Sequence, residues 1–505
     1  MTALTLASLT YRAAERFGDK VALHCEGRPF SFLELERRIT ALAAGLSDLG
    51  LRSGQRVILY LPNSWQWIVC YYAIARIGCV VVPANILLSG EELQFIAEDC
   101  GASALIAPAE RTVALASLIG QQLALAYITV GDPLIPSAAQ FETLLITSRR
   151  SPTPDIAPQD LSTICYTSGT TGRPKGAVLT HAAVVLNTAM TATMHIRRGD
   201  DVVVTALPCT HVYGNVVMNA AFLCGYSLVL LARFDAEQVL EAIERYRATL
   251  FEGVPTMYFY LIGSEGDRRR QLSTLRRATV GGQTMPLSQL LETRKWLGCP
   301  LLELWGMTEI AGPGTTHSFY GPEKPGSIGL PLPSNQLKIV EIHDRTTLVK
   351  SSAVGEMLIR GPTLMREYWH RPEETDAVLQ DGWLATGDLA YCDQDDYLYV
   401  VDRVKEMIIT AGYNIYPSEL ERVIAEHPAV QMVAVGAAPD LAKGELAIAY
   451  VVLKSGGIAS EESLLTYCRT RLASYKVPKG IRFVTELPKT STGKIIRRAL
   501  AHLAT

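Results

Sequence analysis

The sequence lacks the features of several other classes of protein. Its ten cysteines form no C-x-x-C pair, and the first twenty residues hold neither a charged segment nor a long apolar run. We therefore expect no secretory signal and no disulfide framework, but reduced and mostly buried thiols in a cytoplasmic protein. The net charge of −3 provides no strongly basic face, which argues against nucleic acid or an anionic membrane as a partner.

Long hydrophobic runs are also missing. The most apolar stretch, residues 68–88, is interrupted by Arg76, Gly78 and Pro83. This pattern predicts a buried helix followed by a strand, and no transmembrane segment. The sequence shows no internal repeat, no low-complexity segment and no lipidation or peroxisomal signal at its C-terminus.

What the chain does contain is typical of a globular enzyme. It has 505 residues, of which 48% are apolar and 19% charged, and this length suggests two to four units of about 150 residues. Helix-like segments alternate with strand-like segments; the helix-like ones are 32–49, 65–77 and 236–248, and the strand-like ones are 56–61, 79–82 and 250–251. Such alternation predicts an α/β fold with mostly parallel sheets covered by helices.

The pattern changes after about Thr347. Short strand-like segments at 355–360 and 397–401, linked by turns, predict a small antiparallel subdomain that resembles a β-barrel. After Arg403 comes a further unit of about a hundred residues, the size of one small domain. In that unit we expect helices at 418–426 and 462–472 and strands at 430–436 and 448–453. We predict an N-terminal domain of residues 1–404, with two parallel α/β subdomains and the β subdomain, and an α+β C-terminal domain of residues 405–505.

Residues 166–176, YTSGTTGRPKG, are the most informative stretch of the chain. Gly169, Gly172 and Gly176 allow positive φ angles and close approach of a ligand to the backbone. Successive amides in such turns form an anion-binding nest, and Lys175 adds a charge suited to phosphate. The stretch therefore predicts a site for a polyphosphate such as ATP.

This loop is not a Walker A sequence, because Gly176 follows Lys175 where that motif has a hydroxyl residue to hold Mg²⁺. The alternative is a flexible Ser/Thr/Gly linker. A linker would rarely contain Pro-Lys-Gly and then continue directly into a strand-like segment, so we favour the phosphate site.

Four further clusters carry polar groups at fixed spacing: ELWGMTE at 303–309, TGD at 386–388, DRVKEMIITAGYNIYPSELE at 402–421 and PKTSTGKIIRR at 488–498. Each alone has an ordinary explanation. Glu309 could be a surface carboxylate or a cap, residues 386–388 could be a turn, and the basic residues at 489–498 could be a solvated face. Together with residues 166–176 they contain the cations, the carboxylates and the turns that a nucleoside triphosphate requires.

With these motifs the sequence resembles the adenylate-forming (AMP-binding) superfamily, which includes acyl-CoA synthetases, adenylation domains of peptide synthetases and firefly-type luciferases. The resemblance extends from residues 30–35 to Lys494, and the five clusters follow the family's order. It implies that a carboxylic acid reacts with ATP and Mg²⁺ to give an acyl-adenylate and pyrophosphate. The acyl group then passes to a thiol, usually that of CoA. It also implies that the C-terminal domain is mobile.

The resemblance implies roles for individual residues. The phosphate loop is matched by Thr167, Ser168, Gly169, Thr170, Thr171, Gly172 and Lys175. The segments beside adenine are matched by Gly281, Gly282, Gln283, Trp305, Gly306, Met307 and Thr308. Glu309 matches the Mg²⁺ carboxylate, Asp388 and Arg403 match the partners of the ribose hydroxyls, and Lys494 matches the lysine of the adenylation step. The candidate catalytic residues are Lys494, Thr171, Glu309 and His211.

Physical reasoning supports the role of Lys494. Attack of a carboxylate on the α-phosphate brings two anions together, and such chemistry depends on positioning and charge stabilisation. In the family, Lys405 falls at the hinge of the C-terminal domain, and Gly412 and Tyr413 lie on a loop that lines the pantetheine tunnel. The sequence departs from the common pattern at two positions, with Asp402 in place of Gly and Glu406 in place of Asp.

The resemblance places the acyl pocket at His211, Val212, Tyr213, Asn215, 281–283 and 305–312. His211 could gate the acid or be structural. We expect Gly214, Gly281, Gly282 and Gly312 to leave room for the acid. These stretches contain no arginine for a second carboxylate, so we predict an apolar monocarboxylic acid, with a medium- or long-chain fatty acid favoured over an aromatic one.

Three alternatives to an acid–CoA ligase remain open. They are a free-standing ligase that loads a carrier protein, a luciferase-type oxygenase, and a catalytically silent nucleotide-binding protein. The presence of Lys175, Glu309, Asp388, Arg403 and Lys494 argues against the last. The sequence leaves the oligomeric state open, and a homodimer is compatible with it.

Overall fold

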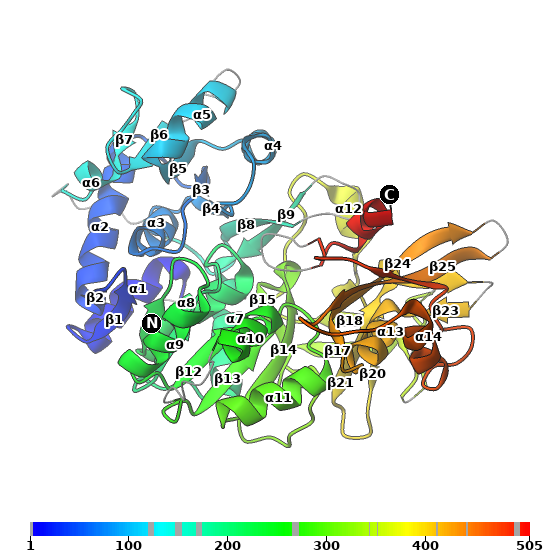
Figure 1. Cartoon of the computed structure of the whole chain (residues 1–505). Coiled ribbons are helices and arrows are strands. Elements are labelled where there is room, and N and C mark those ends of the chain that lie inside the picture. The colour runs from blue at the N-terminus through cyan, green and yellow to red at the C-terminus, as the bar shows by residue number, and fades with distance from the viewer. Residues whose placement is uncertain are drawn as a thin grey trace.

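The computed structural model describes residues 4–119, 126–146, 154–167, 174–264, 272–342, 344–350, 352–410, 413–440, 443–488 and 495–504. The strands in these ranges form four sheets. Two large sheets and one small sheet belong to the N-terminal part, and the fourth lies in a separate C-terminal domain, at the right in Figure 1. The predicted α/β class is thereby confirmed.

The first large sheet has the strand order β7-β6-β5-β3-β4-β8-β9 among the described residues, and all its pairs are parallel except β8 with β9. Its strands are β3 (Arg56–Leu59), β4 (Val80–Pro83), β5 (Ala104–Pro108), β6 (Ala126–Val130), β7 (Ala139–Gln140), β8 (Leu161–Thr167) and β9 (Lys175–Thr180). The helices of this region are α2 (Phe32–Asp48), α3 (Trp65–Arg76), α4 (Gly90–Cys100), α5 (Ala109–Ile119) and α6 (Phe141–Leu144).

The second large sheet has the order β16-β15-β14-β13-β12-β10-β11-β1-β2 among the described residues, with a parallel centre and antiparallel edges. Its strands are β1 (Val21–Cys25), β2 (Arg28–Ser31), β10 (Val202–Thr205), β11 (Ser227–Leu230), β12 (Leu250–Gly253), β13 (Arg277–Val280), β14 (Leu301–Met307), β15 (Gly312–Thr316) and β16 (Leu330–Pro331). The helices of this region are α1 (Leu6–Phe17), α7 (His181–Met194), α8 (Val212–Cys224), α9 (Ala236–Arg245), α10 (Pro255–Ser264) and α11 (Leu287–Leu297).

The third sheet is antiparallel, as predicted for the β subdomain. It consists of β17 (Gln336–Val340), β18 (Gly355–Arg360), β19 (Leu379–Gln380), β20 (Trp383–Cys392) and β21 (Leu398–Arg403), with the short helix α12 (Pro372–Asp376) before β19. No pairing between the described strands closes this sheet into a barrel.

The C-terminal domain has a hydrophobic core of its own. Its strands are β22 (Ile408–Thr410), β23 (Tyr413–Ile415), β24 (Val430–Asp440), β25 (Gly444–Leu453) and β26 (Gly480–Phe483). The helices α13 (Pro417–Ala425) and α14 (Glu461–Arg469) and the 3₁₀ helix η3 (Arg497–Ala504) complete it.

Helix α3 shows how the sequence produces the core. Pro62 and Asn63 end the preceding extended segment, and the Ser64 hydroxyl caps the helix by accepting a hydrogen bond from the amide of Trp67. The residues from Trp67 to Arg76 are all buried, as the apolar run at 68–88 predicts. In the described part of the chain, no helix combines the length and the apolar character needed to cross a membrane.

Asn63 joins the two large sheets. Its side-chain amide donates hydrogen bonds to the carbonyls of Leu207 (2.9 Å) and Leu231 (3.1 Å), and its oxygen accepts one from the amide of Cys209 (2.8 Å). Residues 207–212 lead into α8, so this buried side chain fixes the start of α8 against the first sheet.

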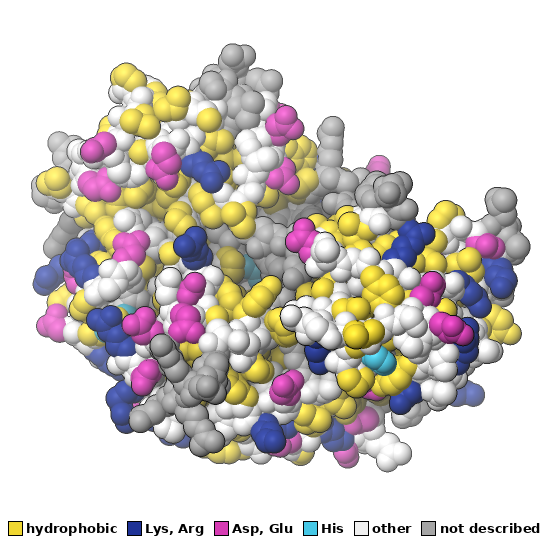
Figure 2. All heavy atoms as spheres, in the orientation of Figure 1, with side chains coloured by type: hydrophobic (Ala, Val, Ile, Leu, Met, Phe, Trp, Pro, Cys, Tyr) yellow, Lys and Arg dark blue, Asp and Glu magenta, His cyan; other side chains and the backbone are white. Residues whose placement is uncertain are grey.

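The surface agrees with the small net charge. On the face in Figure 2, Lys and Arg side chains lie among Asp and Glu side chains and form no continuous basic area. The same face is hollowed where the two large subdomains and the C-terminal domain meet.

Candidate active site

The predicted phosphate loop connects two paired strands. Thr167 at the end of β8 is the register partner of Lys175 at the start of β9. Residues 168–173 lie outside the described residues, and with them Ser168, Gly169, Thr170, Thr171 and Gly172. The hairpin therefore fixes both ends of the loop at the edge of the first sheet.

The ammonium group of Lys175 has two neighbours from a distant segment. It forms an ion pair with the carboxylate of Glu374 on α12, and it lies 5.4 Å from the ring centre of Tyr368. Residues 366–369 run alongside β9, with the amide of Trp369 donating to the carbonyl of Gly176 (2.7 Å). Pairing with β9 thus brings Tyr368 to the base of the phosphate loop.

Glu309 lies on a short 3₁₀ helix (Thr308–Ile310) that follows β14. The side-chain amide of Asn187 on α7 donates hydrogen bonds to the carbonyls of Ile310 (2.9 Å) and Pro313 (2.8 Å) and so fixes this turn. Glu309 is only 8% exposed, and its Oε1 accepts a hydrogen bond of 2.7 Å from the hydroxyl of Tyr368. Burial, together with the charge of Glu309, raises the pKa of Tyr368 far above its ordinary value, so the phenol stays protonated and donates.

Glu309 fits the predicted magnesium role. The described residues contain no cluster of three or more His, Cys, Asp or Glu side chains that could hold a metal ion by themselves. Mg²⁺ in nucleotide sites usually takes one or two carboxylates and completes its shell with phosphates and water. A single buried carboxylate, held by Tyr368 beside β9, matches that donor set.

Asp388 and Arg403 are register partners on β20 and β21. Arg403 Nε lies 2.9 Å from Asp388 Oδ1, and the indole N–H of Trp305 donates to Asp388 Oδ2 (2.8 Å). Asp388 is buried, whereas half of the Arg403 side chain is exposed. The structure thus brings the two residues predicted for ribose into contact and adds Trp305 as the group that orients Asp388.

The segments predicted to flank adenine lie at the carboxyl ends of neighbouring parallel strands. Gly281, Gly282 and Gln283 follow β13, whereas Trp305, Gly306 and Met307 close β14 and Thr308 follows it. Ligands of open α/β sheets bind outside this edge. The geometry therefore places these residues where a nucleotide base would be expected.

Three of the glycines expected to leave room for the acid do not do so. A Cβ atom at Gly214 would lie 2.3 Å from the carbonyl oxygen of Pro208, and one at Gly281 would lie 2.3 Å from Leu304. At Gly312 it would lie 2.7 Å from the side chain of Asn187. The prediction was wrong for these positions, because the space beside each glycine is filled by protein atoms.

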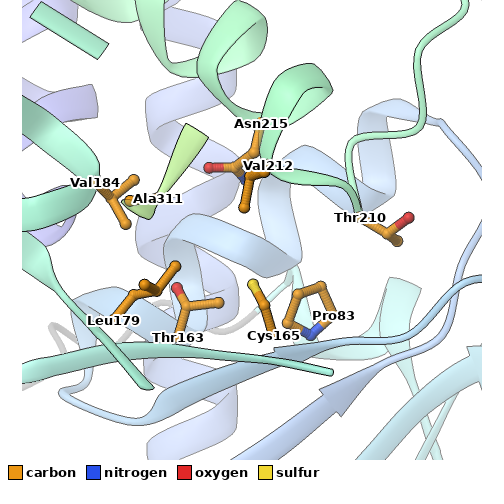
Figure 3. A pocket seen from close by; sticks show the side chains of 9 residues that line it. All are labelled: Pro83, Thr163, Cys165, Leu179, Val184, Thr210, Val212, Asn215 and Ala311. Carbon is orange, nitrogen blue, oxygen red and sulfur yellow. The ribbon is translucent and has the colours of Figure 1, made fainter. Parts of the chain in front are cut away.

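A narrow pocket lies between the first large sheet and the helices α7 and α8 (Figure 3). Of the residues predicted for the acyl pocket, Val212, Asn215 and Ala311 line it. The lining residues that sequence reasoning missed are Pro83, Thr163, Cys165, Leu179, Val184 and Thr210. Burial, with a smaller effect of the Glu309 charge, raises the pKa of the Cys165 thiol to about 12, so Cys165 is a neutral wall and not a nucleophile.

Two other residues predicted for the acyl pocket make structural contacts. The hydroxyl of Tyr213 donates to the buried carboxylate of Glu252 (3.1 Å) and contacts the hydroxyl of Thr279. His211 is the N-cap of α8, and its Nδ1 accepts a hydrogen bond of 3.3 Å from the amide of Tyr213. His211 thus has the structural role that the sequence left open, as the cap of α8. A role of His211 in gating the acid stays a prediction.

The C-terminal residues of the predicted site are only partly described. Lys405 lies on a 3₁₀ turn (Val404–Glu406) between β21 and β22. Tyr413 is half exposed and stacks on Tyr475, with ring centres 4.7 Å apart. Gly412 and Lys494 lie outside the described residues. The loop that carries Lys494 is closed at its base by a hydrogen bond from the amide of Ile496 to the carbonyl of Pro488 (2.9 Å).

Comparison with known families agrees with this arrangement. The model of the AMP-binding enzyme family matches residues 10–369, and that of the AMP-binding enzyme C-terminal domain matches residues 419–494. The chain belongs to the AMP-binding enzyme family. The predicted membership of the adenylate-forming superfamily, in its acyl-CoA synthetase branch, is confirmed.

Individual relatives cover nearly the whole chain. A long-chain-fatty-acid–CoA ligase of Bacillus subtilis (strain 168) is 36% identical over 98% of this chain and 94% of its own length. A feruloyl-CoA synthase of an Amycolatopsis species is 36% identical over 97% of both chains. The crystal structure of ATP-bound MatB from Rhodopseudomonas palustris has a TM-score of 0.91 at 28% identity, covering 99% of both chains. The apo structure of MatB has a TM-score of 0.80 with the same identity and coverage.

Proposed function

We propose that this AMP-binding enzyme is an acid–CoA ligase that works in two steps at one site. In the first step, an oxygen of the acid's carboxylate attacks the α-phosphorus of ATP, and the bond to the departing pyrophosphate breaks. In the second step, the sulfur of CoA attacks the acyl carbon, AMP leaves, and the thiol proton passes to solvent. The products are acyl-CoA, AMP and pyrophosphate.

One observation carries this proposal. Trp305 on β14 donates a hydrogen bond to Asp388. In the turn after β14, Glu309 accepts a hydrogen bond from Tyr368, whose ring lies beside Lys175. Trp305, which orients the predicted ribose partner Asp388, and the phosphate-side carboxylate of Glu309 thus lie four residues apart on one continuous segment. That is the arrangement needed to hold the two ends of one nucleotide.

The residues of the site contribute mainly by positioning and by charge. We assign Lys175 to the β- and γ-phosphates, for which its ammonium group would exchange its present partner Glu374. Tyr368 keeps Glu309 oriented, and Mg²⁺, when bound there, supplies positive charge to the phosphates. Asp388 and Arg403 hold the ribose, and Lys494, on the C-terminal domain, stabilises the charge that develops at the α-phosphate.

We propose an apolar monocarboxylic acid as the substrate. The described residues that line the pocket include no lysine or arginine that could pair with a second carboxylate. A medium- or long-chain fatty acid is the first candidate, supported by the similarity to the Bacillus subtilis ligase. An aromatic acid is the second, supported by the equally similar feruloyl-CoA synthase and by the hydroxyl and amide groups of Thr163 and Asn215 in the pocket.

The organisation of the chain completes the proposal. We place the boundary between the domains at Val404 and Lys405, with residues 1–404 and 405–505 as the two parts. A cytoplasmic location is supported by the ten cysteines, which all lie in the described ranges and are free thiols.

The proposal is tested by pyrophosphate release across straight-chain, branched and aromatic acids, with and without CoA. We expect acid-dependent release and the formation of acyl-CoA with at least one apolar acid. Activation of an acid without consumption of free CoA would instead favour a carrier-protein ligase. No release with any acid would support the silent nucleotide-binding protein and refute the proposal.

A further inference from the structure

Asp402 and Glu406 lie on either side of Lys405 in the chain and face the same arginine, Arg497. The guanidinium of Arg497 donates two hydrogen bonds to the carboxylate of Glu421 on α13. Arg497 Nη2 donates to Glu421 Oε2 (2.7 Å), and Arg497 Nε donates to Glu421 Oε1 (3.2 Å). Its third group, Nη1, lies 2.7 Å from Glu406 Oε2 and 3.9 Å from Asp402 Oδ1. Glu406, Glu421 and Arg497 all follow Lys405 in the chain and move together when the backbone turns there.

Asp402 precedes Lys405 and belongs to the N-terminal part of the chain. It lies on β21, where it is the register partner of Leu389 on β20, and it is 4% exposed. One oxygen, Oδ1, accepts a hydrogen bond from the amide of Arg403 (2.8 Å). The other, Oδ2, accepts one from the amide of Ser418 in the first turn of α13 (2.8 Å). Asp402 therefore reaches from the N-terminal part to two groups of the C-terminal domain, the Ser418 amide and Arg497.

We propose that Asp402 is a positioning residue that holds the C-terminal domain in the orientation seen here. Any rotation about Lys405 separates the Asp402 carboxylate from both Ser418 and Arg497. The carboxylate then has to be solvated again or find new partners, so these contacts favour the present orientation. This inference rests on the proposed two-step function, in which the domain changes its orientation between the steps.

The same cluster also holds the residues that directly follow the segment 489–494. Arg497 lies directly after Ile496, whose amide closes the loop of residues 488–496 on Pro488. Holding Arg497 against Asp402 therefore holds the base of that loop against the end of β21. The nearby Arg403 pairs with Asp388, so the cluster lies next to the residues predicted for the ribose.

We assign the held orientation to the adenylation step. The chain superimposes better on ATP-bound MatB, with a TM-score of 0.91, than on the apo form of the same protein, with 0.80. Loss of the Asp402 contacts should therefore weaken the first step and spare the second.

The test compares Asp402→Ala with Glu419→Gln, a matched control that also removes an ion pair of α13. Glu419 pairs with Lys476 inside the C-terminal domain (2.8 Å) and has no part in the cluster around Arg497. Acid-dependent pyrophosphate exchange measures the first step, and single-turnover formation of acyl-CoA from premade acyl-adenylate measures the second. Losing hydrogen bonds to a charged group corresponds to about a tenfold effect or more, so we expect exchange in Asp402→Ala to fall about tenfold. Acyl-CoA formation should stay equal or rise, and the control should change neither step.

Small-angle X-ray scattering without ligands adds a readout that needs no activity. We expect the profile of Asp402→Ala to move away from the profile calculated for the present orientation, and the profile of the control to stay. Equal loss in both steps, or unchanged exchange and scattering in a folded variant, would overturn the proposal. Should Asp402→Ala fail to fold, Asp402→Asn, which keeps an acceptor for Ser418 and removes the charge facing Arg497, undergoes the same measurements with the same criteria. If the wild type forms no acyl-adenylate, the proposed function fails, and the scattering comparison still decides the role of Asp402.

Discussion

The hydroxyl of Tyr368 donates a hydrogen bond of 2.7 Å to the carboxylate of Glu309, and the ring of the same tyrosine lies 5.4 Å from the ammonium group of Lys175. Tyr368 thus touches both the carboxylate predicted for Mg²⁺ and the lysine predicted for phosphate. One side chain sets the distance between the two charges that would hold the triphosphate.

Tyr368→Phe removes the hydrogen bond and keeps the ring. A hydrogen bond to a charged group contributes about 1.5–3 kcal/mol, so a freely rotating Glu309 should bind Mg²⁺ more weakly. We expect pyrophosphate exchange to need about tenfold more Mg²⁺ for half-maximal rate. Tyr391→Phe, in a ring that stacks on Tyr399 in the β subdomain, serves as the control. An unchanged Mg²⁺ requirement in Tyr368→Phe would show that Glu309 needs no such support.

Lys494→Ala should separate the two steps. Removing one preorganised electrostatic contact costs on the order of 10²-fold in rate, and we expect at least that loss in acid-dependent pyrophosphate exchange. Formation of acyl-CoA from premade acyl-adenylate should suffer much less, because the α-phosphate no longer needs that charge. Lys479→Ala, at an exposed position of the same domain, is the control. Exchange at the wild-type rate in Lys494→Ala would refute the role of this lysine.

Lys405→Pro tests the hinge. Proline fixes φ near −65° and removes one rotation at this position. We expect thioester formation to fall while pyrophosphate exchange is largely kept, because only the second step requires the domain to turn. Lys405→Ala removes the same side chain and leaves the backbone free, so it should retain both steps. Equal losses in the two steps of Lys405→Pro would place the hinge elsewhere.

His181 predicts a pH dependence of stability. It is fully buried at the start of α7, and neither of its ring nitrogens has a hydrogen-bond partner among the described residues. Burial lowers its pKa from 6.5 to about 4. Below pH 6.5 the imidazole of His181 is therefore protonated in the unfolded chain but stays neutral in the folded protein. As a result, the free energy of unfolding decreases as the pH falls from about 6.5 to about 4.

The measurement is denaturant unfolding of the wild type and of His181→Leu between pH 4 and pH 8. Relative to the variant, the free energy of unfolding of the wild type should fall by up to about 1.4 kcal/mol per pH unit between about pH 6.5 and about pH 4. Above about pH 6.5 the difference between the two proteins should not change with pH. Groups other than His181 titrate in both proteins and cancel in the difference. A constant difference across the whole range would mean that His181 keeps its ordinary pKa in the folded protein.

Much of the site could be predicted from the sequence because its parts are local. The strand-like residues on both sides of 168–173 predict a loop between two strands, and the structure pairs Thr167 with Lys175. The family resemblance assigns Asp388 and Arg403 to one ligand, and they are register partners on adjacent strands. The alternation of helices and strands likewise predicts the parallel sheets.

What could not be predicted depends on contacts between distant segments. Tyr368 reaches Glu309, 59 residues away, because residues 366–369 pair with β9. Thr163 and Cys165 enter the pocket because their strand faces α8, and nothing in their local sequence indicates this. The atoms that surround a glycine also come from distant segments of the fold. The sequence therefore does not reveal that the space beside Gly214 and Gly312 is filled by protein atoms.

We propose that one site makes an acyl-adenylate and then transfers its acyl group to CoA. The most direct test is a single-turnover experiment with radiolabelled ATP and an acid that the enzyme accepts, in which CoA is withheld and then added. We expect one equivalent of acyl-AMP and of pyrophosphate per protein before CoA is added, and conversion of the acyl-AMP to acyl-CoA and AMP afterwards. Release of ADP and phosphate, or acyl-CoA that forms without any acyl-AMP, would refute the two-step reaction at one site.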